Sequence, residues 1–504
     1  MSSTSVGAEA PLATTLALFA RLEELGVRYC HWKSTPSLGT ALAGRTDLDL
    51  LVEREDADRF AEAARGLGFK PFISHASRRF PAVEDLLGYD EETGRLIHLH
   101  VYYQLILGEH YIKNHRLPFE RALIGSSVLR DRVRVPPPEL EVAILAYRTL
   151  LKYRDTDALK DQLGLGRRGG IPREALAELR ALIASTTPDA VGRAIEAELP
   201  GLAPGPVVGL IELVGDNARD AVALLHLRRE ARTALRAYER VPAGTAWWRY
   251  VRARASGVWP FRIVTRSAGR RAVKRKSPRA GGLVVAVIGS DGAGKSTAIE
   301  HIVDWLGWRL NVSVQYLGSS QPSRTTASVK RVAKLGRALA RRLPGGADEA
   351  PSGGVVGVLL ALRHLADARD RERRARVAHR LASQGVLVLL DRYPLPGVLV
   401  AGRPLDGPRI RLTLAAGSRL LRMLAEREER IYRRLPRPDH LLVLRVSPEV
   451  ARVRRPDHVA KDLAARTAAL DRLEGITIPM TMIDADQPLE RVQADVRAAL
   501  WRLL

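Results

Sequence analysis

The chain of 504 residues is longer than a single hydrophobic core usually supports, so two or three domains are expected. Hydrophobic residues make up 46% of it, which excludes a chain that is disordered throughout. Its one cysteine, Cys30, excludes an intramolecular disulfide and suits a reducing compartment, and the formal net charge of +24 favours acidic partners.

The N-terminal segment favours an amphipathic helix over a signal peptide, because it lacks an early basic region and its apolar stretch soon meets Arg21 and Glu23. No run of about 18 apolar residues occurs in the sequence, so no membrane span is predicted. We therefore expect a cytoplasmic protein.

Residues 1–137 mix strand and helix patterns and predict an α+β domain, which ends at three consecutive prolines. A helix is expected at 56–68 (DADRFAEAARGLG). Strands are expected at 27–33 (VRYCHWK), 47–53 (DLDLLVE) and 95–103 (RLIHLHVYY).

Asp47 and Asp49 are two positions apart on one of these strands, so both carboxylates face the same side. Two such carboxylates can share a divalent metal ion that carries a nucleotide triphosphate. The alternative is a solvated strand edge. Upstream, Lys33 and Ser34, with Gly39 and Gly44, could form a turn that contacts phosphate.

The stretch 31–53 (HWKSTPSLGTALAGRTDLDLLVE) resembles the minimal nucleotidyltransferase fold, with its glycine-serine turn and D-x-D strand. The resemblance covers about residues 12–160 and is closest to the branch that carries an H-W-K element. It implies a third carboxylate from a later strand, where this sequence offers His98 with His100 on the same face. Either His98 replaces that carboxylate as a metal ligand, or the domain has lost catalysis and only binds or senses a ligand. We favour lost or altered activity; a polar strand face in water is the alternative for the two histidines.

Residues 138–245 show helical periodicity, clearest at 139–153 and 173–184, and predict a helical region. Residues 246–281 form a basic linker dotted with aromatic side chains. We interpret it as a solvated linker whose tryptophans pack on a neighbouring domain. Peripheral contact of 246–280 with a membrane surface is the sharper alternative. A nucleic-acid partner is not expected, because the basic residues are dispersed and no reading module is recognisable.

From 282 to 504 strand and helix patterns alternate, which predicts an α/β domain with a parallel sheet wrapped by helices. A loop is expected at 343–354. The expected strands are 283–289 (LVVAVIG), 312–318 (VSVQYLG), 385–391 (GVLVLLD), 440–446 (HLLVLRV) and 476–484 (ITIPMTMID).

Residues 289–296 (GSDGAGKS) fit G-x-x-x-x-G-K-[ST] and lie between a strand pattern and a helix pattern. The glycines allow a tight turn whose backbone N–H groups face phosphate oxygens, and the helix adds its positive end. Lys295 would reach the β- and γ-phosphates of ATP, and the Ser296 hydroxyl would bind Mg²⁺. A glycine-rich turn without a ligand is the alternative. The expected nucleotide contacts are Gly289, Ser290, Asp291, Gly292, Ala293, Gly294, Lys295, Ser296 and Thr297.

A second candidate element ends the strand at 385–391, where Asp391 is followed by Arg392. In a parallel sheet this aspartate lies beside the phosphate loop, where it can hold Mg²⁺ through water or orient the acceptor. Arg392 could neutralise a transferring phosphate. The alternative is a strand cap and a surface arginine.

GSDGAGKST followed by DRYP resembles the thymidylate kinase group of P-loop nucleoside monophosphate kinases, and 436–455 and 483–496 extend the resemblance over about 282–504. It implies transfer of the ATP γ-phosphate to a nucleoside monophosphate or a related small acceptor. It also implies a lid carrying Arg454 and Arg455, with Arg452 and Lys461 as weaker candidates. A solvated basic helix end is the alternative for this cluster.

The sequence departs from that family at three places. The second strand is followed by GSSQPSR without the usual arginine-glutamate-proline element, the segment after DRYP is LPGVLVAGRPLDGP, and Arg445 stands where an aspartate is common. The acceptor therefore stays open. Two rival functions are a nucleotide-gated regulatory protein with a degenerate N-terminal domain and a bifunctional nucleotidyltransferase and kinase.

Overall fold

The computed structural model divides into two compact units, residues 1–266 and 267–504, each with its own strands and helices. The finer domain boundaries expected from the sequence remain predictions. The structure describes residues 10–108, 112–154, 158, 171–215, 220–255, 275–340, 354–400, 402–413, 418–454, 456, 460–471, 473 and 475–504.

The first unit contains a mixed sheet in which β2 is parallel to β5, while the other pairs are antiparallel. The strands expected around Cys30, Asp49 and His98 are confirmed, and two further strands were not foreseen. In sheet order the strands are β1 (Tyr29–His31), β2 (Leu48–Val52), β5 (Leu96–Tyr102), β4 (Val83–Tyr89) and β3 (Lys70–Ile73).

The two faces of this sheet belong to different hydrophobic clusters, as strand alternation requires. Leu48, Leu50 and Val52 pack in the cluster of α1 (Ala13–Glu24) and α3 (Ala57–Gly66). Leu51 and Tyr102 pack instead with α5 (Pro138–Lys152) and the helices that follow it. The region expected to be helical therefore shares one core with the strands. Besides α5, this region contains α7 (Arg173–Ile183), α8 (Pro188–Glu198), α9 (Gly205–Gly215) and α10 (Ala221–Ala234).

Short elements complete the first unit. Trp247 and Trp248 on α11 (Ala243–Ala255) are exposed, at 64% and 65%. Most of the expected linker beyond them lies outside the described residues. The short elements are α2 (Leu38–Leu42), the hairpin β6 (Leu105–Leu107) and β7 (His115–Leu117), α4 (Glu120–Gly125), the hairpin β8 (Val128–Arg130) and β9 (Val133–Val135), and α11 (Ala243–Ala255).

The second unit is built on a five-stranded sheet that is parallel throughout, as the sequence predicts. The strand that comes first in the sequence, β11, lies in the centre of the sheet. The next two strands, β12 and β13, lie on one side of it, and the last two, β16 and β17, lie on the other. Such an arrangement leaves a crevice at the carboxyl ends of the central strands, where ligands bind in open α/β sheets. In sheet order the strands are β12 (Val312–Tyr316), β13 (Leu387–Asp391), β11 (Leu283–Gly289), β16 (His440–Arg445) and β17 (Met480–Asp484).

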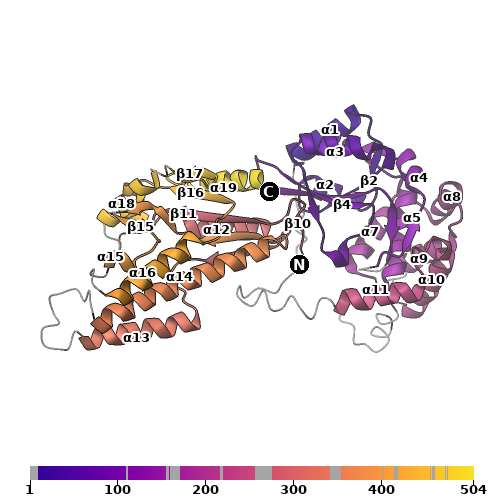
Figure 1. Ribbon diagram of the computed structural model, residues 1–504. Coiled ribbons are helices and arrows are strands. Elements are labelled where there is room, and N and C mark those ends of the chain that lie inside the picture. Colours follow the sequence, from indigo (N-terminus) through magenta and orange to yellow (C-terminus); the bar gives the residue numbers. More distant parts are fainter. Residues whose placement is uncertain are drawn as a thin grey trace, which may run out of the picture. The chain divides into compact units, whose positions relative to one another are not determined.

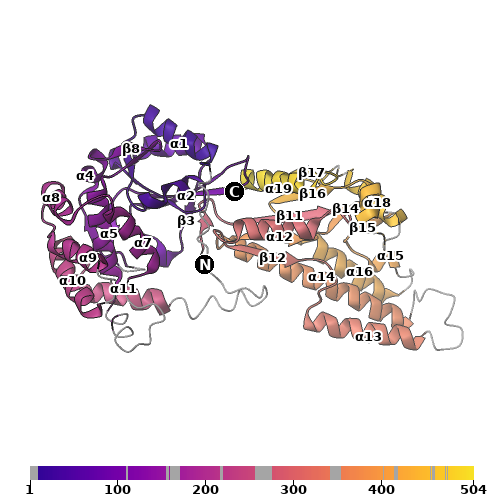
Figure 2. The same ribbon diagram turned by 180° about the vertical axis from the view of Figure 1, so that it is seen from behind.

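Helices cover both faces of this sheet. Ala286 and Ile288 pack with Ala375 of α14 (Gly354–Ala382) on one face. Helix α19 (Leu489–Leu503) packs on α12 (Lys295–Leu306). Helix α13 (Arg324–Ala340) runs alongside α14 in both views (Figures 1 and 2). The remaining elements are the hairpin β14 (Leu395–Val400) and β15 (Arg403–Leu405), α15 (Ile410–Thr413), α16 (Arg419–Arg433), α17 (Pro448–Arg454) and α18 (Ala460–Asp471).

In the described part of the chain, no helix has both the length and the apolar character needed to cross a bilayer. Most of the loop expected at 343–354 lies outside the described residues.

Candidate functional site

The glycine-rich loop 289–296 connects the central strand β11 to helix α12, in the context that the sequence predicts. Gly292 and Gly294 have φ of +89° and +85°, a region that side chains rarely adopt. A Cβ at Gly292 would lie 3.0 Å from the Ala451 carbonyl oxygen, and one at Gly289 would lie 2.8 Å from that of Leu444. The loop therefore needs glycine both for its turn and for its close approach to neighbouring backbone.

Lys295, the first residue of α12, folds back over this loop. Its Nζ donates to the carbonyl oxygens of Gly289 at 3.0 Å and Ser290 at 2.7 Å. The Ser290 hydroxyl is buried and has no hydrogen-bond partner among the residues that the structure describes. Because buried polar atoms are normally paired, this hydroxyl suits a loop shaped around a polar ligand.

Three cationic side chains from three different elements converge on Asp291 of the loop. Arg466 of α18 places Nη1 2.8 Å from the Asp291 carboxylate, and Arg392 places Nη2 at 3.1 Å. Lys295 Nζ lies 3.9 Å from the same carboxylate. Cations gathered in this way at the loop can neutralise a bound polyphosphate.

Arg392 reaches the loop from an unusual backbone conformation. It follows β13 with φ of +65°, a left-handed geometry that is uncommon outside glycine and that concentrates at functional sites. This turn directs the side chain from the end of β13 to Asp291. The role expected for Arg392, to neutralise a transferring or acceptor phosphate, stays a prediction.

Asp391 ends β13 at the carboxyl edge of the sheet, in register with Val287 of β11. Burial raises the pKa of its carboxyl above the ordinary value, although Arg392 and Lys295 oppose this rise. Ser296 lies in the first turn of α12 and is exposed. A hydroxyl and a carboxylate are oxygen donors of the kind that Mg²⁺ prefers, so these two residues fit a magnesium ion bound with phosphate oxygens.

The structure describes some of the expected lid residues and not others. Arg454 is exposed at the end of α17 and donates to the Ala485 carbonyl oxygen at 2.9 Å, and Arg452 is exposed. Arg455 and the side chain of Lys461 lie outside what the structure describes. Besides Arg392, a second arginine, Arg466, contacts the glycine-rich loop, and sequence reasoning missed it. Its only signal was a charged residue in an alanine-rich helix.

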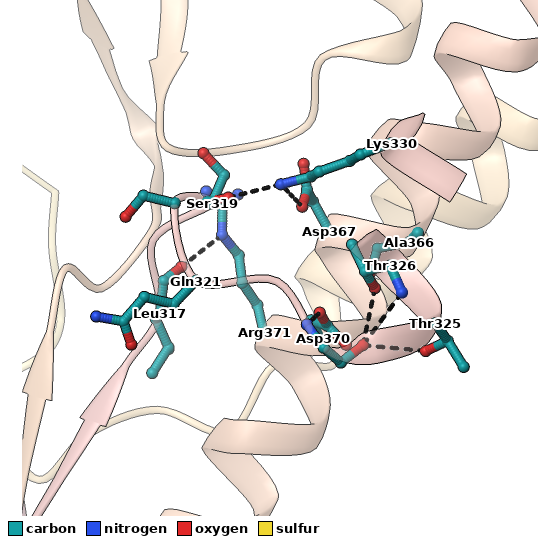
Figure 3. Close-up of polar contacts among 12 residues, drawn as sticks. Leu317, Ser319, Gln321, Thr325, Thr326, Lys330, Ala366, Asp367, Asp370 and Arg371 are labelled. Carbon is teal, nitrogen blue, oxygen red and sulfur yellow. Dashed lines mark hydrogen bonds and ion pairs between the residues drawn. The ribbon is translucent and has the colours of Figure 1, made fainter. Parts of the chain in front are cut away.

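The loop that follows β12, at the same edge of the sheet, is held by basic side chains of two helices (Figure 3). Arg371 of α14 donates from Nε to the Leu317 carbonyl oxygen at 2.7 Å. Lys330 of α13 donates to the Ser319 carbonyl oxygen at 2.6 Å and pairs with Asp367 at 2.7 Å. These contacts hold residues 317–319, and the Leu317 backbone N–H donates to the Asp391 carbonyl oxygen at 2.8 Å.

In the first unit, Asp47 and Asp49 are both engaged by basic groups on the α5 face of the sheet. Lys33 Nζ lies 2.8 Å from Asp49 Oδ1, and His100 Nδ1 lies 3.1 Å from the same oxygen. Burial raises the pKa of Asp49, but Lys33 and His100 lower it by more, so its net pKa falls well below the ordinary value. His98 Nδ1 lies 2.8 Å from Asp47 Oδ1.

A third carboxylate completes this group but comes from an unexpected strand. Asp85 on β4 lies 2.8 Å from His98 Nε2, so His98 is placed between Asp47 and Asp85. Sequence reasoning missed Asp85 because no strand was recognised at 83–89. Among the described residues, no group of three or more His, Cys, Asp or Glu side chains is arranged to hold a metal ion. The expected metal ligation by Asp47, Asp49 and His98 stays a prediction.

The turn between β1 and α2 is anchored to α5. Ser34 has φ of +62°, and the next backbone N–H, of Thr35, donates to Glu141 Oε1 at 2.8 Å. Burial raises the pKa of Glu141 to about 7, which the Thr35 hydrogen bonds partly oppose. This anchor fixes the turn that presents Lys33.

Comparison with known proteins finds similarity in the C-terminal part of the chain. The uncharacterized ATP-binding protein YghR of Escherichia coli K12 is 28% identical over 228 residues, which cover 43% of this chain and 86% of YghR. The uncharacterized ATP-binding protein YghS of the same strain is 29% identical over 224 residues, which cover 43% of this chain and 91% of YghS. No protein-family model matches the chain.

Proposed function

We propose that the second unit is an ATP- and magnesium-dependent phosphotransferase, similar in mechanism to the thymidylate kinase group of P-loop kinases. The observation that carries this proposal is the arrangement around the glycine-rich loop, where Lys295, Arg392 and Arg466 meet Asp291 beside the carboxylate of Asp391. The similarity to two proteins named as ATP-binding supports the same assignment.

In this proposal the loop backbone and Lys295 hold the β- and γ-phosphates of ATP. Magnesium, held by Ser296 and through water by Asp391, would supply positive charge to the phosphate oxygens. Arg392 and Arg466 leave Asp291 to bind the transferring group, with Arg454 and Arg455 as further lid candidates. The acceptor oxygen forms a bond to the γ-phosphorus as the bond to the β,γ-bridging oxygen breaks, and ADP is the second product. A phosphate acceptor reacts as its anion, whereas a hydroxyl acceptor also passes its proton to water.

The acceptor is proposed to be a nucleoside monophosphate or a related small phosphorylated or hydroxyl compound. Its identity can be tested directly by incubating the protein with ATP labelled at the γ-phosphate and pools of nucleotides, nucleosides and sugar derivatives. We expect one pool to gain label. Slow hydrolysis that no pool affects would instead favour a nucleotide-gated regulatory protein.

A dependence on pH follows from the environment of Lys295. Burial lowers the pKa of its ammonium to about 8, with Asp291 opposing and Arg392 adding to the effect. The ammonium is charged below this pKa, so affinity for Mg·ATP should be full at neutral pH and should weaken as the pH rises above 8, by up to about tenfold for each unit. Dissociation constants measured across this pH range test the prediction, and a constant affinity well above pH 8 would contradict it.

A further inference from the structure

Four basic side chains gather in the first unit, on the face of its sheet that packs against α5. Lys33 and Lys113 both place Nζ over the ring of Tyr102, 5.5 Å and 4.9 Å from its centroid. Lys113 also donates to the Tyr102 hydroxyl at 3.1 Å. Arg148 and Lys152 stand four positions apart on α5 and therefore share one side of that helix. All four are half-buried, so solvent still reaches them.

These four side chains, which we call the cation cluster, repel one another. Burial lowers the pKa of Lys113 to about 7, and the charges of Lys33, Arg148 and Lys152 add to the effect. The pKa of Lys152 is also lowered to about 7, by burial and then by Arg148 and Lys33. The fold thus holds like charges together at a cost in stability, and a bound anion would offset that cost.

The acidic groups nearby are already engaged by basic side chains of the chain. Asp49 binds Lys33 and His100, and Asp47 lies against His98. The Lys33 ammonium lies 2.8 Å from Asp49 Oδ1 and so neutralises one of the two carboxylates that were expected to bind a metal ion. An anion that approaches this face meets ammonium and guanidinium groups directly.

Orphaned polar atoms lie on the same face. Arg148 Nη1 and the indole Nε1 of Trp32 are buried and have no hydrogen-bond partner within the described part of the chain. The Trp32 ring lies 5.1 Å from the Tyr102 ring, and Lys33 Nζ lies 5.1 Å from the Trp32 ring centroid. Both orphaned groups can only donate, so what they need is an acceptor. Phosphate oxygens are strong acceptors and carry the charge that the cluster would balance.

We propose that the cation cluster binds a small phosphate-bearing anion directly, without a divalent metal ion. This makes the first unit a phosphate-binding or sensing domain, with the ammonium of Lys33 in place of the metal. The inference is separate from the proposed function of the second unit, because it involves no residue of the glycine-rich loop.

The test is titration calorimetry on the full chain carrying Lys295→Ala, which we expect to weaken phosphate binding in the second unit. Inorganic phosphate, pyrophosphate and ATP are titrated separately in the presence of EDTA, so that the three arms distinguish a single phosphate, a diphosphate and a nucleotide. We expect at least one of them to bind. Three further variants each add one substitution to Lys295→Ala: Lys113→Gln, Arg148→Gln or Lys152→Gln. Each should weaken that binding by about tenfold or more, because each removes a charge-assisted hydrogen bond to the anion.

Arg193→Gln is the matched control, because Arg193 is an exposed arginine on α8 of the same unit. It should bind as tightly as the parent. The three cluster variants should keep or raise the melting temperature, since each removes a repelling charge, and Lys113→Arg should retain binding. Absence of binding in EDTA, binding that requires Mg²⁺, or equal affinity in cluster and control variants would overturn the proposal.

Discussion

Replacement of Lys295 by Ala should lower ATP turnover by about 10²–10³-fold, the size expected when a preorganised charge at a transferring phosphate is lost. Lys295 is the buried cation of the glycine-rich loop, and its Nζ is held by two loop carbonyl oxygens at 3.0 Å and 2.7 Å. The γ-phosphate of bound ATP would accept hydrogen bonds from the same ammonium group. Steady-state release of ADP, measured with saturating acceptor, checks the prediction.

Lys334→Ala is the matched control for this variant, since Lys334 is exposed on α13 of the same unit. Its turnover should equal that of the parent, and both variants should keep the parental melting temperature within a few degrees. Parental turnover in Lys295→Ala would show that the ammonium takes no part in phosphate transfer.

Asp391→Asn is expected to have the second largest effect, a loss of turnover of about 10²-fold. The substitution keeps the shape of the side chain at the end of β13 but removes its negative charge. If Asp391 holds magnesium through water, the variant should need more Mg²⁺ to reach half of its maximal rate. A rate measured against Mg²⁺ concentration separates this effect from a simple loss of folding.

Asp304→Asn serves as its control, because Asp304 is an exposed carboxylate on α12. This control should follow the parental dependence on Mg²⁺. An unchanged magnesium requirement in Asp391→Asn would remove Asp391 from the metal site, even if turnover fell.

The glycine-rich loop could be predicted from the sequence because its signal is local. Every fixed position of the motif lies within eight residues, and the flanking patterns changed from strand to helix at the places where β11 ends and α12 begins. The three central strands of the five-stranded sheet, β11, β13 and β16, were predictable for a similar reason: buried parallel strands are continuous apolar runs bounded by polar residues.

Arg466 and Asp85 could not be predicted, because their roles depend on long-range packing. Arg466 is 175 positions away from the carboxylate that it contacts, and nothing around it distinguishes it from a solvated helix residue. Asp85 lies on β4, where VEDLLGY places two acidic residues in a strand, a pattern that β propensity disfavours. Tertiary contacts with His98 and with β3 override that preference.

The helical region was identified by its periodicity, but its partner was not. The 3.6-residue pattern of α5 predicts that one side of the helix is buried, but it does not identify the element on which that side packs. The structure packs α5 against Leu51 and Tyr102, the face that also carries Asp49 and His100. This packing is what brings Arg148 and Lys152 toward Lys33.

The central claim is that residues 289–296 hold the triphosphate of ATP, and direct binding tests it with the fewest assumptions. Calorimetric titration of the folded full chain with Mg·ATP should give saturable binding that weakens by about tenfold or more in Lys295→Ala and stays unchanged in Lys334→Ala. Failure of the parent chain to bind Mg·ATP, or equal affinity in Lys295→Ala, would contradict the account.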